Sequence, residues 1–211
     1  MCEPRTNTVI TIGRQFGSAG LAIGHQVAKD LGIKLYDKRI LDELTTAQND
    51  SLELTKKNVE KSPNSFLYSL VMDTETGTYI DMPINHKKFI AQTDTIKKLA
   101  KEGPCVLVGR CADYALAGES NVINFYIHAS MDARIRRIAR LYDVTDAKAQ
   151  DIIIDRDTKR HNYYNFYSNK KWGEAESYHI CLDSSVLGIE GTAEVIKNLV
   201  AMKERTPKNK L

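Results

Sequence analysis

The stretch Val9–Gly24, which reads VITIGRQFGSAGLAIG, predicts the fold of this chain. It opens with a β-branched run, continues through glycines at positions 13, 17, 20 and 24, and then takes the apolar spacing of a helix up to Leu31. A strand, a glycine-rich turn and a helix can cradle a phosphate, because glycines let backbone N–H groups approach an anion and the helix N-terminus adds partial positive charge. The residues equally allow a plain strand-to-helix turn.

Two positions in this turn differ from the usual nucleotide-binding loop. The pattern G-x-x-x-x-G-K-S/T supplies a lysine for the phosphates and a hydroxyl for magnesium, whereas Leu21 and Ala22 follow Gly20 here. Such a turn would hold phosphate mainly through its backbone and cannot do the usual electrostatic work unaided. The predicted phosphate-contacting residues are Gly13, Arg14, Gly17, Ser18, Ala19 and Gly20.

Composition places the chain among ordinary globular proteins. Its 211 residues are enough for one large domain or one domain with inserts, with 42% hydrophobic and 27% charged residues. The net charge of +3 is too small to imply nucleic-acid binding by itself. The sequence has no apolar run of transmembrane length and no apolar segment of a secretory signal near its start. The four cysteines lack metal-ligand spacing, which favours reduced, mostly buried thiols in a cytoplasmic protein.

Strands and helices alternate along the chain, which predicts an α/β fold with a parallel sheet flanked by helices. Ligands bind such sheets at the carboxyl ends of the strands. Three segments should therefore converge there: residues 13–20, Tyr36-Asp37 and Gly109-Arg110. From Thr45 to about Pro83 the pattern weakens, which indicates an insert or mobile subdomain with helical pieces.

Several polar residues near these strand ends could act on a phosphate. Arg110 is placed for a bidentate grip on phosphate, or for a structural ion pair. Asp37 could hold a ribose, a base or a metal-bound water, or could simply cap the next helix. A later helix carries Arg134, Arg136, Arg137 and Arg140, most of which we expect on a solvated face, with one or two reaching nucleotide phosphates.

The segment 155–172, DRDTKRHNYYNFYSNKKW, is the densest polar cluster in the chain. Arginines on a mobile segment can neutralise the charge of a transferred phosphoryl group, which points to Arg156 and Arg160. The interleaved tyrosines would also suit single-stranded nucleic acid, but their spacing better fits the packing of one amphipathic segment. We expect His128 and His161 to be structural.

Taken together, the sequence resembles the cytidylate kinase-like family, a divergent branch of the P-loop nucleoside monophosphate kinases. The resemblance runs in order over nearly the whole chain. It rests on ITIGRQFGSAGLAIG, LYDK, VLVGRCADYAL, FYIHASMDARIRRI, IIIDRDTKRHNYYNFYSNKKWG and CLDSSVLGIEG.

The resemblance implies one kinase-like domain over residues 1–211, with a five-stranded parallel core, a helical monophosphate-binding insert at about 45–95 and a lid at about 145–175. It implies phosphoryl transfer from ATP to CMP or a related phosphorylated small molecule, with Mg²⁺. By position, Arg110, Arg156 and Arg160 resemble the catalytic arginines. The substrate-binding residues would be Asp37, Arg110, Asp113 and Asp157.

This chain departs from the family in the charges around its phosphates. Leu21 and Ala22 stand where established cytidylate kinases have the loop lysine and hydroxyl, and Val108 and Cys111 replace acidic residues beside Arg110. The sequence therefore leaves a second hypothesis open, a nucleotide-binding sensor without turnover. A third hypothesis, an RNA-associated protein, rests only on segment 155–172.

Overall fold

The computed structural model describes residues 5–55 and 86–206 and contains one five-stranded, entirely parallel sheet. Its strand order is β2-β3-β1-β4-β5, so the strand of the glycine-rich stretch lies at the centre. This confirms the predicted α/β fold. The strands are β1 (Val9–Arg14), β2 (Lys34–Tyr36), β3 (Cys105–Val108), β4 (Val122–His128) and β5 (Ile180–Asp183).

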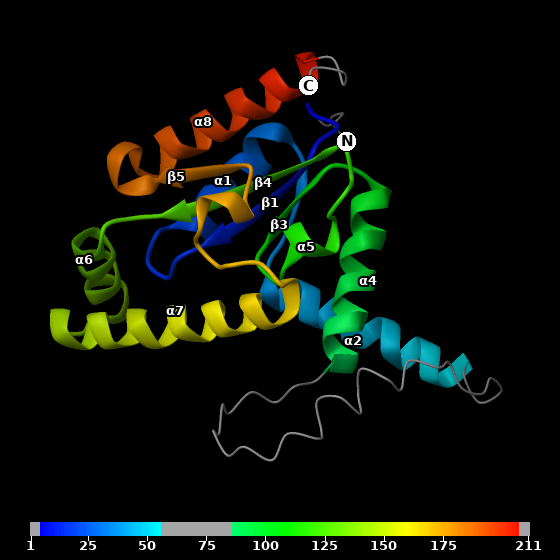
Figure 1. The fold of residues 1–211 in the computed structure, drawn as a ribbon, viewed down its shortest axis with the longest axis horizontal. Helices are drawn as coiled ribbons and strands as arrows, with labels where there is room; N and C mark the ends of the chain where they lie inside the picture. The colour runs from blue at the N-terminus through cyan, green and yellow to red at the C-terminus, as the bar shows by residue number, and fades with distance from the viewer. Residues whose placement is uncertain (1–4, 56–85, 207–211) are drawn as a thin grey trace.

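Helices follow the strands and cover both faces of the sheet (Figure 1). From residue 56 onward, the insert expected between Thr45 and about Pro83 lies outside the described residues. The helices are α1 (Gly20–Leu31), α2 (Lys38–Thr55), α4 (His86–Glu102), α5 (Ala112–Ala115), α6 (Met131–Tyr142), α7 (Asp146–Ser168) and α8 (Ser184–Arg205), with a short 3-10 turn at Ala175–Ser177.

Alternating side chains on the strands build two cores. Ile10 and Ile12 of β1 point to one face, where α1 and α8 pack together. Val9 points to the other face, toward the helices α2, α4 and α5. Because successive residues of a strand face opposite sides, these apolar runs are buried on both faces, as the sequence predicted.

The helix ends follow the expected chemistry. Gly32 ends α1 in the left-handed conformation, and the side chains of Ser130 and Thr145 cap α6 and α7. The helix α7 runs to Ser168, and a left-handed residue follows it. In the described part of the chain, no helix combines the length and apolarity that crossing a bilayer requires.

Candidate active site

A cavity of about 320 Å³ opens at the carboxyl ends of β1 and β3, beneath α7. Six of its lining residues carry a positive side chain and one, Asp113, is acidic. The volume suits a small organic ligand and the charge suits an anion. We call it the first cavity; its cationic residues are Arg14, Lys38, Arg110, Arg156, Lys159 and Arg160.

Arg110 is fixed in this cavity by contacts on two sides. Its Nη2 atom donates to both carboxylate oxygens of Asp42 in α2, at 3.0 and 3.1 Å. Its guanidinium carbon lies 5.6 Å from the ring centre of Tyr163, a cation–π contact with α7. The Nε atom is buried and has no hydrogen-bond partner among the residues that the structure describes. Arg110 therefore has a rigid position and a free donor.

The backbone beneath Arg110 is strained. Gly109, Arg110 and Cys111 have φ values of 80°, 57° and 53° in succession. Residues with side chains rarely adopt this left-handed conformation, and such strain concentrates at functional sites. The turn directs Arg110 into the cavity at the end of β3 and starts the short helix α5.

Asp113 lies at the wall of the first cavity, where it accepts a hydrogen bond of 2.6 Å from the Tyr164 hydroxyl. Lys170 lies 3.9 Å from the same carboxylate. Burial raises the pKa of Asp113 despite these two partners, because a carboxylate loses its hydration there. Burial likewise raises the pKa of the neighbouring Cys111 thiol to about 12, so this free cysteine stays protonated.

The helix α7 is tied to the glycine-rich turn by Asp157. One carboxylate oxygen accepts the backbone N–H of Phe16 at 2.7 Å, and the other lies 2.5 Å from Nη1 of the buried Arg134 in α6. One turn further, Arg160 donates to the backbone oxygen of Arg14 at 2.9 Å. The helices α6 and α7, both distant from the turn in sequence, thus fix the first residues of the turn.

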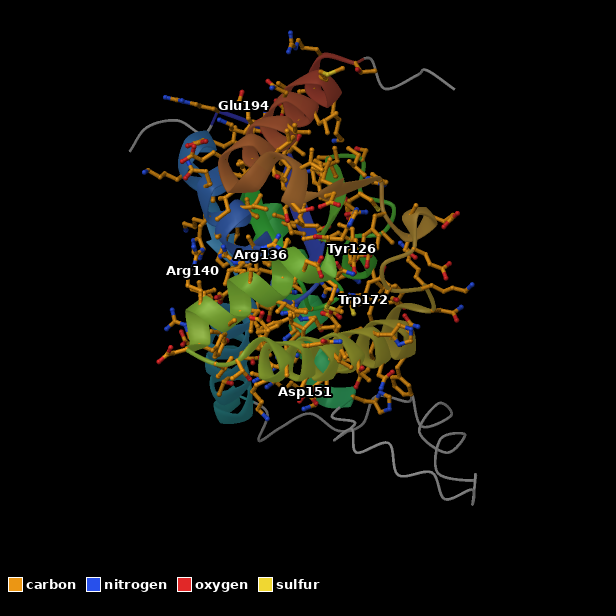
Figure 2. All side chains as sticks on the ribbon, turned by 90° about the vertical axis from the view of Figure 1, so that its left-hand side faces the viewer. Tyr126, Arg136, Arg140, Asp151, Trp172 and Glu194 are labelled. Carbon is orange, nitrogen blue, oxygen red and sulfur yellow. The ribbon has the colours of Figure 1, made fainter. Side chains whose placement is uncertain are left out.

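A second cavity opens on the other side of the turn. It is lined by Gly17, Ser18 and Ala19 of the turn, and by Ser184, Ser185 and Gly188 after β5. The charged residues of its lining are arginines of α6. Figure 2 shows two of them, Arg136 and Arg140, on the same side of the molecule. Arg136 and Arg140 are exposed, as expected for a solvated face, and together with the half-buried Arg137 they line this cavity.

Aromatic side chains form one wall of the first cavity, which is lined by Tyr163, Tyr164, Trp172 and Tyr178. Behind this wall, Tyr126 stacks on Tyr178 with ring centres 4.7 Å apart and meets the edge of Trp172 at 5.5 Å. The tyrosines of segment 155–172 thus pack inward, which is the arrangement that their spacing favoured over an exposed nucleic-acid surface.

The structure brings many of the predicted site residues together and separates others. Gly13, Arg14, Arg110, Asp113, Arg156 and Arg160 line the first cavity, whereas Gly17, Ser18 and Ala19 line the second. Asp37 caps α2 by accepting the N–H of Ile40 at 3.0 Å. The Asp157 carboxylate is occupied by Arg134 and the Phe16 N–H. The first turn of α1 begins at Gly20, which lines neither cavity.

Some residues of the site were not predicted from the sequence. Asp42, which holds Arg110, lies on α2 without any local motif around it. Lys38 and Lys159 also line the first cavity, and Arg134 was grouped with the solvated arginines although it is buried. For the three basic residues, only their charge could have drawn attention to them, and nothing in the sequence around Asp42 points to its contact with Arg110.

In residues 5–55 and 86–206 no group of three or more histidine, cysteine or acidic side chains is arranged to hold a metal ion. The acidic side chains nearest the turn are engaged in the contacts just described, Asp37 with a helix end, Asp113 with Tyr164 and Asp157 with Arg134.

Residues 9–186 match the cytidylate kinase-like family, so the chain belongs to this family. Among solved structures, it is similar to an uncharacterized protein from Eubacterium ventriosum ATCC 27560, with a TM-score of 0.71 and 25% identity over 92% of this chain and 98% of that chain. It is also similar to shikimate kinase from Bacteroides thetaiotaomicron, with a TM-score of 0.52 and 14% identity over 92% of this chain and 98% of that chain. Shikimate kinase from Acinetobacter baumannii, in complex with shikimate, gives a TM-score of 0.50 and 12% identity over 95% and 96%. The likeness to these two kinases shows a shared fold alone. No curated protein matches the chain significantly.

Proposed function

We propose that this protein is a small-molecule kinase that transfers a phosphoryl group from ATP to CMP or a similar phosphorylated acceptor. The observation that carries the proposal is the position of the glycine-rich turn between two cationic cavities. Gly13, Arg14 and Phe16 line the first, and Gly17 to Ala19 line the second. Two anionic reactants bound in these cavities would both lie against the same turn, an arrangement that favours direct transfer between them.

The second cavity is the proposed site for the donor. Its arginines suit a polyphosphate, and the backbone of Gly17, Ser18 and Ala19 borders it. The Ser18 hydroxyl donates to the backbone oxygens of Gln15 and Ile127, at 2.9 and 3.0 Å, so its contribution would come from the backbone. Within residues 5–55 and 86–206, no group of three or more metal-binding side chains is arranged to enclose Mg²⁺. Magnesium would then be held mainly by the phosphates of the donor and by water.

The first cavity is the proposed site for the acceptor. Arg110, with its rigid position and free Nε, would hold the acceptor phosphate. The tyrosine wall offers a surface for a nucleobase, as expected for CMP. Arg156 and Arg160 would add charge from α7, and Asp113 would contact polar groups of the acceptor.

We also propose that residues 145–175 form a lid and that residues 45–95 contain the acceptor-binding insert. The contact of Asp157 with Phe16 supports a lid that closes directly on the turn. In this arrangement Asp157 and Asp37 would act mainly by positioning the lid and α2 around the substrates. Lid closure would exclude water from the transferred group.

A nucleotide-binding sensor is the second candidate. The first turn of α1 has Gly20, Leu21 and Ala22, and so lacks the cation and hydroxyl of an active phosphate loop. Loss of such groups commonly costs several kcal/mol of transition-state stabilisation, roughly 3–4 for a single donor. The same cavities would then bind nucleotides without turnover.

Calorimetric titration with ATP, CMP and other monophosphates, with and without magnesium and with product analysis, separates the two candidates. Binding of both reactants with formation of ADP supports the kinase and identifies the acceptor. Binding without product supports the sensor. Absence of any nucleotide binding would contradict both.

A further inference from the structure

Arg14, the last residue of β1, passes through a space that two glycines leave open. A Cβ atom added to Gly20 would lie 2.7 Å from the Cβ of Arg14 and 3.0 Å from its Cγ. A Cβ atom added to Gly109 would lie 2.9 Å from the Cζ of Arg14 and would overlap its Nη1 atom. The side chain therefore begins beside the first residue of α1 and ends over the turn that carries Arg110.

The guanidinium of Arg14 lines the first cavity in a strongly positive environment. Burial, together with the positive charges of Arg160 and Arg110, lowers the pKa of Arg14 to about 9, while the Asp37 carboxylate partly offsets this. At neutral pH the side chain is still a cation. In the described part of the chain no carboxylate forms a hydrogen bond or an ion pair with it.

This arrangement is unfavourable for the unliganded protein. Arg14 is half-buried, and a cation that has lost part of its hydration is stabilised by a nearby negative charge, whereas its charged neighbours here include two other arginines. A bound anion would compensate all three. The Nε of Arg110, buried and without a partner, points to the same requirement in the same cavity.

We propose that Arg14 supplies the positive charge that a phosphate-loop lysine would supply from the first turn of the helix. From the first cavity it would contact the terminal phosphoryl group of the donor where this group passes from the second cavity to the acceptor. The absence of a side chain at Gly20 is then what admits the arginine. This inference rests on the proposed kinase function. In the transfer, an acceptor phosphate oxygen forms the new P–O bond as the bond to the bridging oxygen of ATP breaks and its electron pair leaves with ADP, and Arg14 keeps its proton.

The test compares Arg14→Met, which keeps the length of the side chain, and Arg14→Lys, which keeps the charge, with the wild type. Arg205→Met removes an exposed arginine at the end of α8 and is the matched control. Each protein is assayed for ATP-dependent phosphorylation of CMP and other monophosphates. Binding of ATP and of inorganic tripolyphosphate is measured by calorimetry, and the melting temperature by thermal unfolding.

We expect Arg14→Met to bind tripolyphosphate at least about tenfold more weakly, as for a lost charged hydrogen bond, and to lower kcat roughly a hundredfold. Its melting temperature should be equal to or above that of the wild type, because an unfavourable cation is removed, whereas loss of a purely structural residue would lower it. Arg14→Lys should recover part of kcat, and Arg205→Met should leave every quantity unchanged.

The outcomes separate this inference from the kinase proposal. Turnover by the wild type that Arg14→Met retains within twofold would overturn the role of Arg14 and leave the kinase standing. Polyphosphate binding without turnover, weakened by Arg14→Met, would overturn the kinase and keep Arg14 as an anion ligand. A wild type that binds neither ATP nor tripolyphosphate would overturn both.

Discussion

Removing the Asp157 carboxylate should strongly destabilise the protein. In Asp157→Ala the backbone N–H of Phe16 loses its acceptor and Arg134 loses its ion pair. The Arg134 side chain is only 7% exposed, so its guanidinium would stay buried without a counter-charge. Breaking a buried pair in this way costs about 3–5 kcal/mol in the free energy of unfolding.

Removing the partner of Asp157, Arg134, should lower the free energy of unfolding by a smaller amount. In Arg134→Met the Asp157 carboxylate keeps the Phe16 N–H, and its side chain, 16% exposed, retains some hydration. We expect a loss of about 1–3 kcal/mol. The double variant leaves no charge buried, so it should be at least as stable as Asp157→Ala alone. The resulting coupling energy would be about 2 kcal/mol or more, within the range for residues in direct contact.

Urea unfolding of the wild type, the two single variants and the double variant measures this coupling. Asp155→Ala is the matched control, because Asp155 lies on the same helix and pairs with Lys159 at the surface, where both side chains are more than half exposed. It should cost less than about 1 kcal/mol. Additive effects of Asp157→Ala and Arg134→Met, within about 0.5 kcal/mol, would refute the interpretation that this pair ties α7 to the turn.

Three further predictions concern the first cavity. Arg110→Ala should weaken monophosphate binding by roughly 1.5–3 kcal/mol, the range for charged hydrogen bonds, and unchanged calorimetric affinity in a folded variant would exclude the proposed grip. Gly109→Ala should displace the Arg14 guanidinium and strain a residue with a φ of 80°. The variant should therefore have a lower kcat and a lower melting temperature than the wild type. Wild-type values of both quantities would contradict the described position of the Arg14 side chain. The pKa of Asp113 is raised above its ordinary value of 3.8, so at a pH between the ordinary and the raised pKa the folded protein binds more protons at this carboxylate than the unfolded chain does. The free energy of unfolding therefore falls as the pH rises from the ordinary pKa through the raised one. Urea unfolding should show that the free energy of unfolding of Asp113→Asn, relative to that of the wild type, increases with pH over the same interval. If the difference between the two proteins did not change with pH, the Asp113 carboxylate would not be the source of the pH dependence.

The layout of the fold could be predicted from the sequence because its signals are local. The β-branched run before Gly13, Gly32 after α1, and the capping residues Ser130 and Thr145 each determine their own neighbourhood. Alternation of strands and helices then implies a parallel sheet, and a parallel sheet brings the carboxyl ends of its strands together. The meeting of Arg14 and Arg110 at one cavity follows from this topology alone.

The partners of these side chains could not be predicted in the same way. Arg110 and Asp42 are 68 residues apart, and Phe16 and Asp157 are 141 residues apart. Such pairs depend on the register of the helices over the sheet, which periodicity does not determine. The family resemblance implied that Asp157 binds substrate, and the structure shows its carboxylate accepting the backbone N–H of Phe16 in the glycine-rich turn.

In the phosphate loop, the sequence motif and the electrostatic function are separate conditions. The motif has a lysine directly after its last glycine, and the sequence Gly20, Leu21, Ala22 lacks it. The electrostatic requirement is for a cation at one position in space, because charge stabilisation depends on distance and solvation rather than on sequence order. Arg14 reaches the end of β3 from the strand side only because Gly20 and Gly109 carry no side chain. That these two glycines leave room for an arginine becomes visible only when β1 and β3 are known to be neighbours. The sequence alone therefore shows a missing lysine, and the position of Arg14 is what leads us to propose a replacement for its charge.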